Sequence, residues 1–252
     1  MRALLLVRAA ALALATLGAL PAGAVDLTVS AAASLANAFD EVGPGFEAAN
    51  PGSKVLFNYG ASGALLQQIA KGAPADVFAS ADRETMDRAQ AQGLVQAARR
   101  RDFASNALVV IVPAVGGRPV AGLADLAGPA FARIAVGLPA SVPAGRYARG
   151  ALEAAGQWAA VEPKTIGANN VRQALDYVAR GEVDAGFVYA TDAALLPGKV
   201  KVALAVPTRA PILYPAAPVA GSANAALAAR FVDYLASPPA QAVLARHGFG
   251  KP

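Results

Sequence analysis

Cysteine is absent from the 252-residue sequence, and histidine occurs once, as His247. Without cysteine the chain has no disulfide framework, thiolate metal site, cysteine nucleophile or lipid-modified cysteine. Catalytic triads and most general acid–base mechanisms use histidine, and His247 stands in the last turn of a predicted helix, where a surface role is typical. These absences argue against an enzyme and against a bare metal cation, and we expect no cofactor.

Long hydrophobic runs are missing beyond the N-terminus. Arg2 and Arg8 precede a run rich in alanine and leucine, and the small-residue motif PAGA follows at 21–24. The pattern is typical of a secretory signal peptide cleaved after Ala24, and the apolar run is too short to span a bilayer. We therefore predict a signal peptide over 1–24 and an exported mature chain.

Charge of one sign is concentrated nowhere along the chain. The formal net charge is +5, and it falls to +3 once the two arginines of the signal peptide are removed. The basic run of Arg99, Arg100 and Arg101 is followed at once by Asp102, so we expect a solvated turn there. We predict no nucleic-acid partner, and the mild positive charge helps an anion to approach.

Short runs of valine, isoleucine and phenylalanine alternate with helical patterns rich in alanine and leucine. About 228 mature residues are enough for one large domain or two smaller ones. The alternation predicts an α/β fold with parallel sheets that are covered on both faces. Strands are predicted at 27–30, 55–59, 77–80, 107–112, 134–136, 185–189 and 200–205, with helices between them and at 224–236 and 239–247.

Residues 31–35 (AAASL) mark the point where the first predicted strand ends and a helix begins. Ser34 is the natural N-cap of that helix, and unpaired backbone N–H groups stand beside it. Open α/β sheets bind their ligands at the carboxyl ends of the strands. The stretch therefore indicates a site for a small anion, although a serine cap is also common on helices that bind nothing.

The same arrangement occurs twice more along the chain. The sequence GASG at 60–63, which contains Ser62, precedes one amphipathic helix, and Asn170 precedes another. A glycine stops each helix, and a strand led in by aspartate follows, with Asp76 in the first case and Asp184 in the second. We interpret this repeated arrangement as a sign of two similar half-molecules that share a cleft. We interpret both aspartates as structural.

Two extended segments are predicted to connect the halves. The first covers 106–113 and the second 214–220. If these segments run side by side, the first domain is discontinuous in sequence. We predict that domain I consists of 25–106 plus 207–252 and that domain II is the insert at 107–206.

The remaining inventory favours binding over catalysis. Ser34, Ser62 and the helix starts offer neutral donors and positive dipole ends without a fixed cation, which suits a tetrahedral oxyanion. No acidic acceptor is evident for a protonated anion such as phosphate, so sulfate remains as an alternative ligand. A secreted hydrolase that uses Ser34 or Ser62 as its nucleophile is the alternative from another functional class.

Five separated motifs resemble those of the periplasmic molybdate-binding proteins of ABC transporters. The resemblance covers essentially the whole mature chain in one register, and the tail from Asp233 to Phe249 is part of it. The motifs are TVSAAASL at 28–35, GAPADVFASAD at 72–82, VPAGRYA at 142–148, NVRQAL at 170–175 and GFVYATDA at 186–193.

The resemblance implies a two-domain type II periplasmic binding protein fold, in which each lobe is a mixed, mostly parallel sheet flanked by helices. It implies that the cleft between the lobes captures molybdate, and tungstate as well, for delivery to the membrane permease of an ABC transporter. It further implies a periplasmic monomer that holds molybdenum only as its oxyanion.

The family's ligand positions fall on Ser34, Ser62, Ala144, Val171 and Tyr189. In the family the two serines donate their hydroxyl and N–H groups, the alanine and the valine donate N–H groups, and the tyrosine donates its hydroxyl. The residues alone had already indicated Ser34, Ser62 and the helix start at Val171. They leave open whether Tyr189 is simply a packing residue, and they do not select Ala144 over its neighbours.

Two departures from the family pattern stand out. Ser62 lies in the sequence ASGA, where the family often has a run of small hydroxyl residues, so its assignment is firmer and fewer spare donors remain. Gly43, Pro44 and Gly45 interrupt a helix that the family keeps continuous, and we expect a break or a solvent-facing kink without effect on binding. Arg146 is a further candidate to pair with the anion, although the family pattern uses no arginine there.

Overall fold

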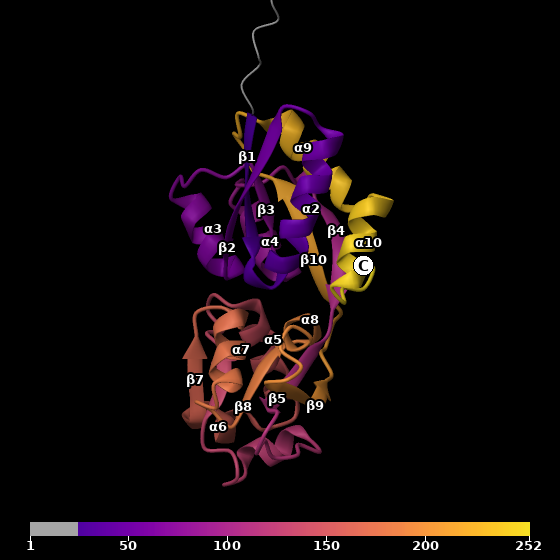
Figure 1. The fold of residues 1–252 in the computed structure, drawn as a ribbon. Helices are drawn as coiled ribbons and strands as arrows, with labels where there is room; N and C mark the ends of the chain where they lie inside the picture. Colours follow the sequence, from indigo (N-terminus) through magenta and orange to yellow (C-terminus); the bar gives the residue numbers. More distant parts are fainter. Residues whose placement is uncertain (1–24) are drawn as a thin grey trace, which may run out of the picture.

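The computed structural model describes residues 25–252, so the predicted signal peptide at 1–24 lies outside the described residues. Two five-stranded sheets, each flanked by helices, lie one above the other and are joined along one side (Figure 1). We call them, with their helices, domain I and domain II. Domain I has the strand order β2-β1-β3-β10-β4, from Ser53–Gly60, Val25–Ala32, Val77–Ala79, Ile212–Pro218 and Arg101–Asn106. Domain II has the order β7-β6-β8-β5-β9, from Thr165–Ala168, Ile134–Gly137, Ala185–Tyr189, Leu108–Pro113 and Val200–Val206.

Both sheets follow one plan. In domain I, β1 runs parallel to β2 and β3, and β10 runs antiparallel to β3 and β4. In domain II, β6 runs parallel to β7 and β8, and β5 runs antiparallel to β8 and β9. The mixed sheets confirm the predicted α/β two-domain fold class. Their common plan agrees with the two half-molecules that the repeated sequence arrangement indicated.

The chain crosses between the sheets twice, on the side where β4 and β10 pair (Figure 1). It leaves domain I at Ala107, between β4 and β5, and it returns over 207–211, between β9 and β10. Every strand of domain II therefore lies between the two crossings. We propose the predicted limits, at 106/107 and 206/207, as the domain boundaries.

Helices cover the sheets of both domains (Figure 1). Phe231 of the C-terminal region packs edge-on against Phe39 and Phe46, with ring centroids 6.0 and 5.1 Å away, and all three rings are buried. This cluster holds the C-terminal tail on domain I.

No helix within 25–252 is long and apolar enough to cross a membrane. The helices are α2 (Ala36–Ala49), α3 (Ser62–Ala70), α4 (Arg83–Ala91), α9 (Ala225–Leu235) and α10 (Pro238–Arg246) in domain I, and α5 (Pro143–Ala154), α6 (Trp158–Val161), α7 (Val171–Ala179) and α8 (Ala190–Ala193) in domain II.

Strands β4 and β7 are absent from the sequence prediction, and both lie at a sheet edge. An edge strand is partly exposed, so its sequence needs no apolar run. β4 (RDFASN) carries charged and polar residues, and β7 (TIGA) is short and contains glycine. Arg101, expected in a solvated turn, begins β4 and pairs with Asp233.

Of the break or solvent-facing kink expected at Pro44, the break does not occur: α2 continues through this residue to Ala49. Phe39 and Val42 before the proline and Phe46 after it are buried against the same core. Pro44 itself faces solvent. The apolar contacts on both sides therefore hold the helix together where the proline removes one backbone hydrogen bond.

Asp76 and Asp184 make the same hydrogen bonds in their two domains. The Asp76 carboxylate accepts the N–H of Thr28 at 2.8 Å, and the Asp76 N–H donates to the Thr28 carbonyl at 2.7 Å. The Asp184 carboxylate accepts the N–H of Arg133 at 2.8 Å, and its N–H donates to the Arg133 carbonyl at 2.9 Å. Both aspartates thus fasten neighbouring backbone, which confirms their structural interpretation.

Candidate functional site

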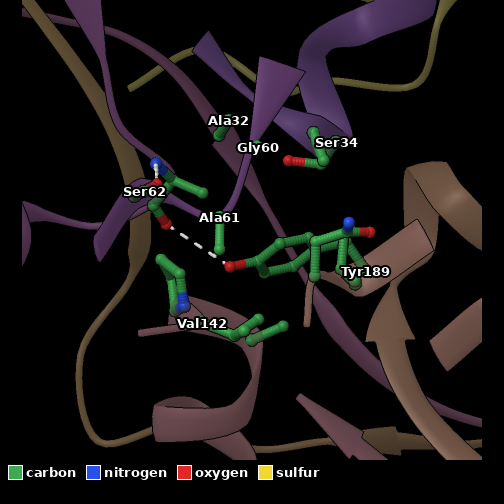
Figure 2. Close-up of a pocket in the computed structure, with 13 residues that line it drawn as sticks. Ala32, Ser34, Gly60, Ala61, Ser62, Val142 and Tyr189 are labelled. Carbon is green, nitrogen blue, oxygen red and sulfur yellow. Dashed lines mark hydrogen bonds between the residues drawn. The ribbon is translucent and has the colours of Figure 1, made fainter. Parts of the chain in front are cut away.

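One pocket between the domains brings the five predicted site residues together (Figure 2). Domain I contributes Ser34 and Ser62, and domain II contributes Ala144, Val171 and Tyr189. The pocket's further lining residues, which sequence reasoning did not single out as ligands, are Ala32, Ala33, Gly60, Ala61, Ala81, Val142, Pro143 and Asn170.

The pocket lies at the carboxyl ends of parallel strands in both sheets. β1 and β2 end in register, with Ala32 opposite Gly60, and the turns that lead into α2 and α3 follow directly. In domain II, α5 and α7 follow β6 and β7, and Tyr189 is the last residue of β8. This is the edge at which open α/β sheets bind ligands, and here two such edges face each other.

Ser34 reaches the pocket in a different way from the one predicted. β1 extends to Ala32, a 3₁₀ turn covers Ala33–Leu35, and Ser34 makes no side-chain cap for α2. The prediction of an N-cap is therefore wrong. The Ser34 hydroxyl instead lies 3.0 Å from the Tyr214 hydroxyl, and Ser34 is buried. A tertiary partner in β10 has taken the place of the local backbone partner.

Ser62 is the first residue of α3 and is fully buried. Its hydroxyl oxygen accepts the N–H of Ala81 at 3.0 Å (Figure 2). Because this bond uses a lone pair and not the proton, the Ser62 O–H remains available as a donor to a ligand. The Ser62 N–H lies in the first turn of α3, where a helix leaves its N–H groups without internal partners.

Two backbone N–H groups face the pocket from domain II. Ala144 is the second residue of α5, after Pro143, and Val171 is the first residue of α7. Within residues 25–252 neither N–H has a hydrogen-bond partner. The Asn170 side chain caps α7 by accepting the N–H of Gln173 at 3.0 Å, which leaves the Val171 N–H free for a ligand. Helix N-termini of this kind favour anions.

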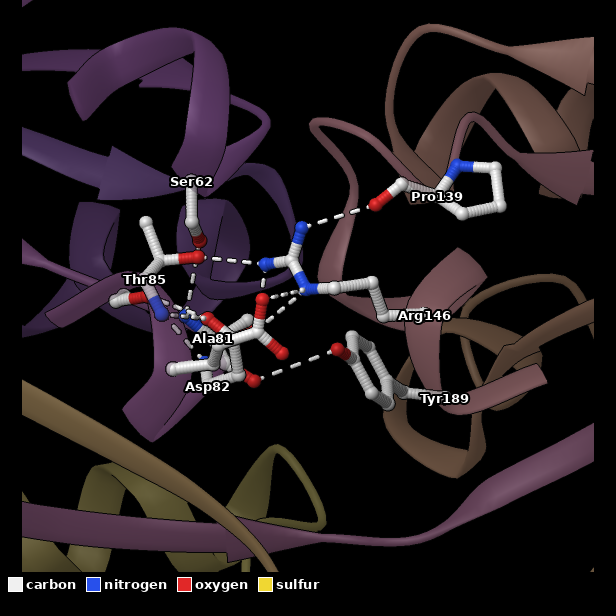
Figure 3. A network of polar contacts seen from close by, with 9 residues as sticks. Ser62, Ala81, Asp82, Thr85, Pro139, Arg146 and Tyr189 are labelled. Carbon is white, nitrogen blue, oxygen red and sulfur yellow. Dashed lines mark hydrogen bonds and ion pairs between the residues drawn. The ribbon is translucent and has the colours of Figure 1, made fainter. Parts of the chain in front are cut away.

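Tyr189 adds a third hydroxyl to the pocket. Its ring is buried, and burial raises the pKa of its hydroxyl well above the ordinary value of 10. The hydroxyl therefore keeps its proton and acts as a donor. Its hydrogen bond to the Ala81 carbonyl of domain I is long, at 3.4 Å (Figures 2 and 3).

Arg146 does not face the pocket as a free cation. Its guanidinium crosses to domain I, where it donates to the Asp82 carboxylate at 2.6 and 3.1 Å and to the Thr85 hydroxyl at 2.6 Å (Figure 3). A third partner, the Pro139 carbonyl at 3.1 Å, holds it to its own domain. The carboxylate thus neutralises the arginine, and the pair fastens the two domains together.

Arg172, beside Val171, makes a second bridge between the domains. It donates to the Asp192 carboxylate of its own domain at 2.6 Å, and to the Ser34 carbonyl and the Asn37 side chain of domain I at 3.1 and 2.7 Å. Burial raises the pKa of Asp192 to about 6, although Arg172 acts in the opposite direction. Both arginines near the pocket are therefore paired with aspartates.

Replacement of Arg146 by methionine is expected to weaken ligand binding about fivefold, because the closed form loses a cross-domain ion pair. Isothermal titration calorimetry measures the effect. Arg149→Met is the matched control on the same helix, since Arg149 is exposed and its ion pair with Glu153 and its contact with the Trp158 ring both lie within domain II. Equal affinities of the Arg146 and Arg149 variants would show that the pair does not contribute to closure.

The geometry of the described residues does not suit a serine hydrolase. His247, at the end of α10, lies 2.9 Å from a carboxylate oxygen of Glu41 in α2. The hydroxyls of Ser34 and Ser62 contact Tyr214 and the Ala81 N–H instead. Within 25–252, no group of three or more histidine or acidic side chains is placed to hold a metal ion.

Comparison with known proteins places the chain among transport-related binding proteins. A family model described as bacterial extracellular solute-binding protein matches residues 27–250. The molybdate-binding protein ModA of Escherichia coli is 38% identical over 249 residues, which cover 95% of this chain and 95% of that protein.

Solved structures with the same architecture bind more than one anion. The periplasmic molybdate-binding protein of Azotobacter vinelandii matches with a TM-score of 0.77 and 26% identity, over 90% of this chain and 99% of the other. The sulfate-binding protein SubI of Mycobacterium tuberculosis also matches with a TM-score of 0.77, at 22% identity, over 89% of this chain and 86% of the other. The second likeness shows the fold alone, so the fold does not decide between these anions.

Proposed function

Because this chain belongs to the family of bacterial extracellular solute-binding proteins, we propose that it captures molybdate between its two domains and delivers it to the permease of an ABC transporter. The chain is a binding protein and not an enzyme. Its relatives include the molybdate-binding protein of Escherichia coli, which matches over nearly the full length of both chains.

The observation that carries the proposal is the donor set of the pocket. Ser34, Ser62 and Tyr189 supply hydroxyls, and the N–H groups of Ala144 and Val171 lie at two helix starts. None of the described lining residues carries a charge. A doubly negative oxyanion is then held by short charge-assisted hydrogen bonds from both domains, without an opposing full charge.

Closure follows from this division of the donors. Only the closed form brings the serines of domain I and the donors of domain II to one anion, so the ligand binds the closed form better than the open form. Differential affinity of this kind shifts the population toward the closed form. We propose that the permease recognises this closed, loaded form.

Protonated anions fit this pocket poorly. Hydrogen phosphate needs an acceptor for its proton, and the described lining residues include no aspartate, glutamate or histidine. Molybdate, tungstate and sulfate carry no proton at neutral pH, so each offers only hydrogen-bond acceptors to the donors of the pocket. Among them the sequence relatives favour molybdate, and tungstate is proposed as a second ligand because its size nearly coincides.

We also propose the cellular location and the oligomeric state of the protein. The family consists of extracellular proteins, so we place the mature chain in the periplasm, exported by a signal peptide that is cleaved after Ala24. It acts as a monomer whose contact with the permease is transient.

A thermal-shift comparison of four anions tests the function. At molybdate or tungstate concentrations a thousandfold above Kd, linkage adds about 4 kcal/mol to the free energy of unfolding. For a chain of this length, that raises the Tm by about 8 to 16 °C. Sulfate and phosphate at equal ionic strength are the controls. A shift with sulfate together with none from molybdate or tungstate would transfer the proposal to sulfate.

A further inference from the structure

A row of polar side chains, half-buried at Asn106 and fully buried from Tyr214 onward, leads from the crossing between the domains to Ser34. Asn106 is the last residue of β4, directly before the crossing at Ala107. Tyr214 lies in β10, is fully buried, and stands between Asn106 and Ser34. The Asn106 amide nitrogen is 3.2 Å from the Tyr214 hydroxyl, which is 3.0 Å from the Ser34 hydroxyl. Neither Asn106 nor Tyr214 lines the pocket.

The direction of the first bond is fixed by the backbone. The Asn106 side-chain oxygen accepts the N–H of Ala107 at 2.9 Å. The amide nitrogen must therefore point the other way, where it meets the Thr191 hydroxyl at 2.9 Å and the Tyr214 hydroxyl. Since an amide nitrogen only donates, Asn106 is the donor to Tyr214.

The direction of the second bond follows from the first. Within residues 25–252, the Tyr214 hydroxyl has two hydrogen-bond partners, Asn106 and Ser34. If Ser34 donated to Tyr214, the proton of this fully buried hydroxyl would have no acceptor, which is costly. Burial also raises the pKa of Tyr214 well above its ordinary value, so the proton stays on the phenol. Tyr214 therefore donates to Ser34.

We propose that Asn106 and Tyr214 are positioning residues that fix Ser34 as a hydrogen-bond donor toward the bound anion. The inference rests on the proposed function and deepens it. With its oxygen occupied by Tyr214, Ser34 presents its own proton to the pocket, as Ser62 does through Ala81. The pocket then selects an oxyanion without a proton. Asn106, Tyr214 and Ser34 all lie in domain I, and Thr191, the other partner of Asn106, lies in domain II.

A double-mutant cycle between Tyr214→Phe and Ser34→Ala tests the inference. Titration with sodium molybdate gives Kd for the wild-type chain, both single variants and the double variant. We expect Tyr214→Phe to weaken binding about fivefold in the wild-type background, because Ser34 loses its fixed direction. In the Ser34→Ala background the same change should alter Kd by less than about twofold, since no hydroxyl is left to direct.

Asn106→Asp is the second variant, and it is nearly isosteric. A carboxylate at this position accepts a hydrogen bond from the Tyr214 hydroxyl, which reverses the direction of both hydrogen bonds in the row. Ser34 must then donate to Tyr214, and its lone pairs face the anion. We expect a loss of affinity of about tenfold or more. The same change in the Ser34→Ala background measures the repulsion by the added charge alone. The loss in the wild-type background should exceed that value.

Tyr234→Phe, on α9 and outside the pocket lining, is the matched control and should leave Kd unchanged. Equal losses with and without Ser34, for both Tyr214→Phe and Asn106→Asp, would overturn the inference and leave these residues a purely structural role. The wild-type titration tests the proposed function separately. If the wild-type chain does not bind molybdate, the proposed function is overturned before any variant is compared.

Discussion

Replacement of Ser62 by alanine is expected to weaken molybdate binding by about 1.5 to 3 kcal/mol, which is roughly a 10- to 150-fold rise in Kd. Ser62 is fully buried, and its oxygen already accepts the Ala81 N–H at 3.0 Å, so its proton points to the ligand. A hydrogen bond to a charged acceptor is stronger than one between neutral groups. Calorimetric titration with molybdate measures the loss.

The variant also leaves the buried Ala81 N–H without its acceptor. The ligand-free protein should therefore lose about 1 to 3 kcal/mol of stability, which chemical denaturation measures independently of binding. Ser53→Ala is the matched control, because Ser53 lies at the opposite end of β2 and donates to the Asn50 carbonyl. An unchanged Kd in Ser62→Ala would remove this residue from the site. We expect Ser34→Ala to weaken binding within the same range.

Local signals in the sequence carried much of the candidate site. The apolar periodicity of α3 and α7, with a glycine after each, indicated the helix starts at Ser62 and Val171; Asn170 caps α7 as predicted, whereas Ser62 is the first residue of α3 and makes no side-chain cap. Gly72 and Gly181, which end these helices, have positive φ angles of 85° and 68°, the conformation in which glycine is the natural choice. Such features depend only on neighbours in the chain.

Partners far apart in the sequence were not predictable in this way. Ser34 and Tyr214 are 180 positions apart, and Arg146 and Asp82 are 64 apart. No periodicity connects such pairs, so sequence reasoning assigned Ser34 the local role of an N-cap and left Arg146 as a candidate for the anion. Ala144 was reached only through the family resemblance, because any residue can donate its backbone N–H.

Replacement of Gly63 by alanine is expected to raise the molybdate Kd about thirtyfold, because it obstructs closure. Gly63 of domain I donates its N–H to the Ser141 carbonyl of domain II at 2.9 Å. A Cβ atom at this position would lie 2.7 Å from the Ser141 oxygen and 2.8 Å from its Cα. Both contacts are with backbone, which cannot rotate away, and overpacking of this kind costs about 1 to 3 kcal/mol.

The same change should not destabilise domain I by itself. Gly63 lies inside α3 and its φ is not positive, and alanine is favoured over glycine in a helix by about 1 kcal/mol. Gly150→Ala in α5 is the matched control, since it makes the same substitution in a helix where the new Cβ would meet nothing within 4 Å beyond its own stretch of chain. The expected result is thus a ligand-free protein as stable as the control that binds molybdate much more weakly. If Gly63→Ala and Gly150→Ala bound molybdate equally well, the contact between Gly63 and Ser141 would not belong to the ligand-bound form, and the closure described above would be wrong in this region.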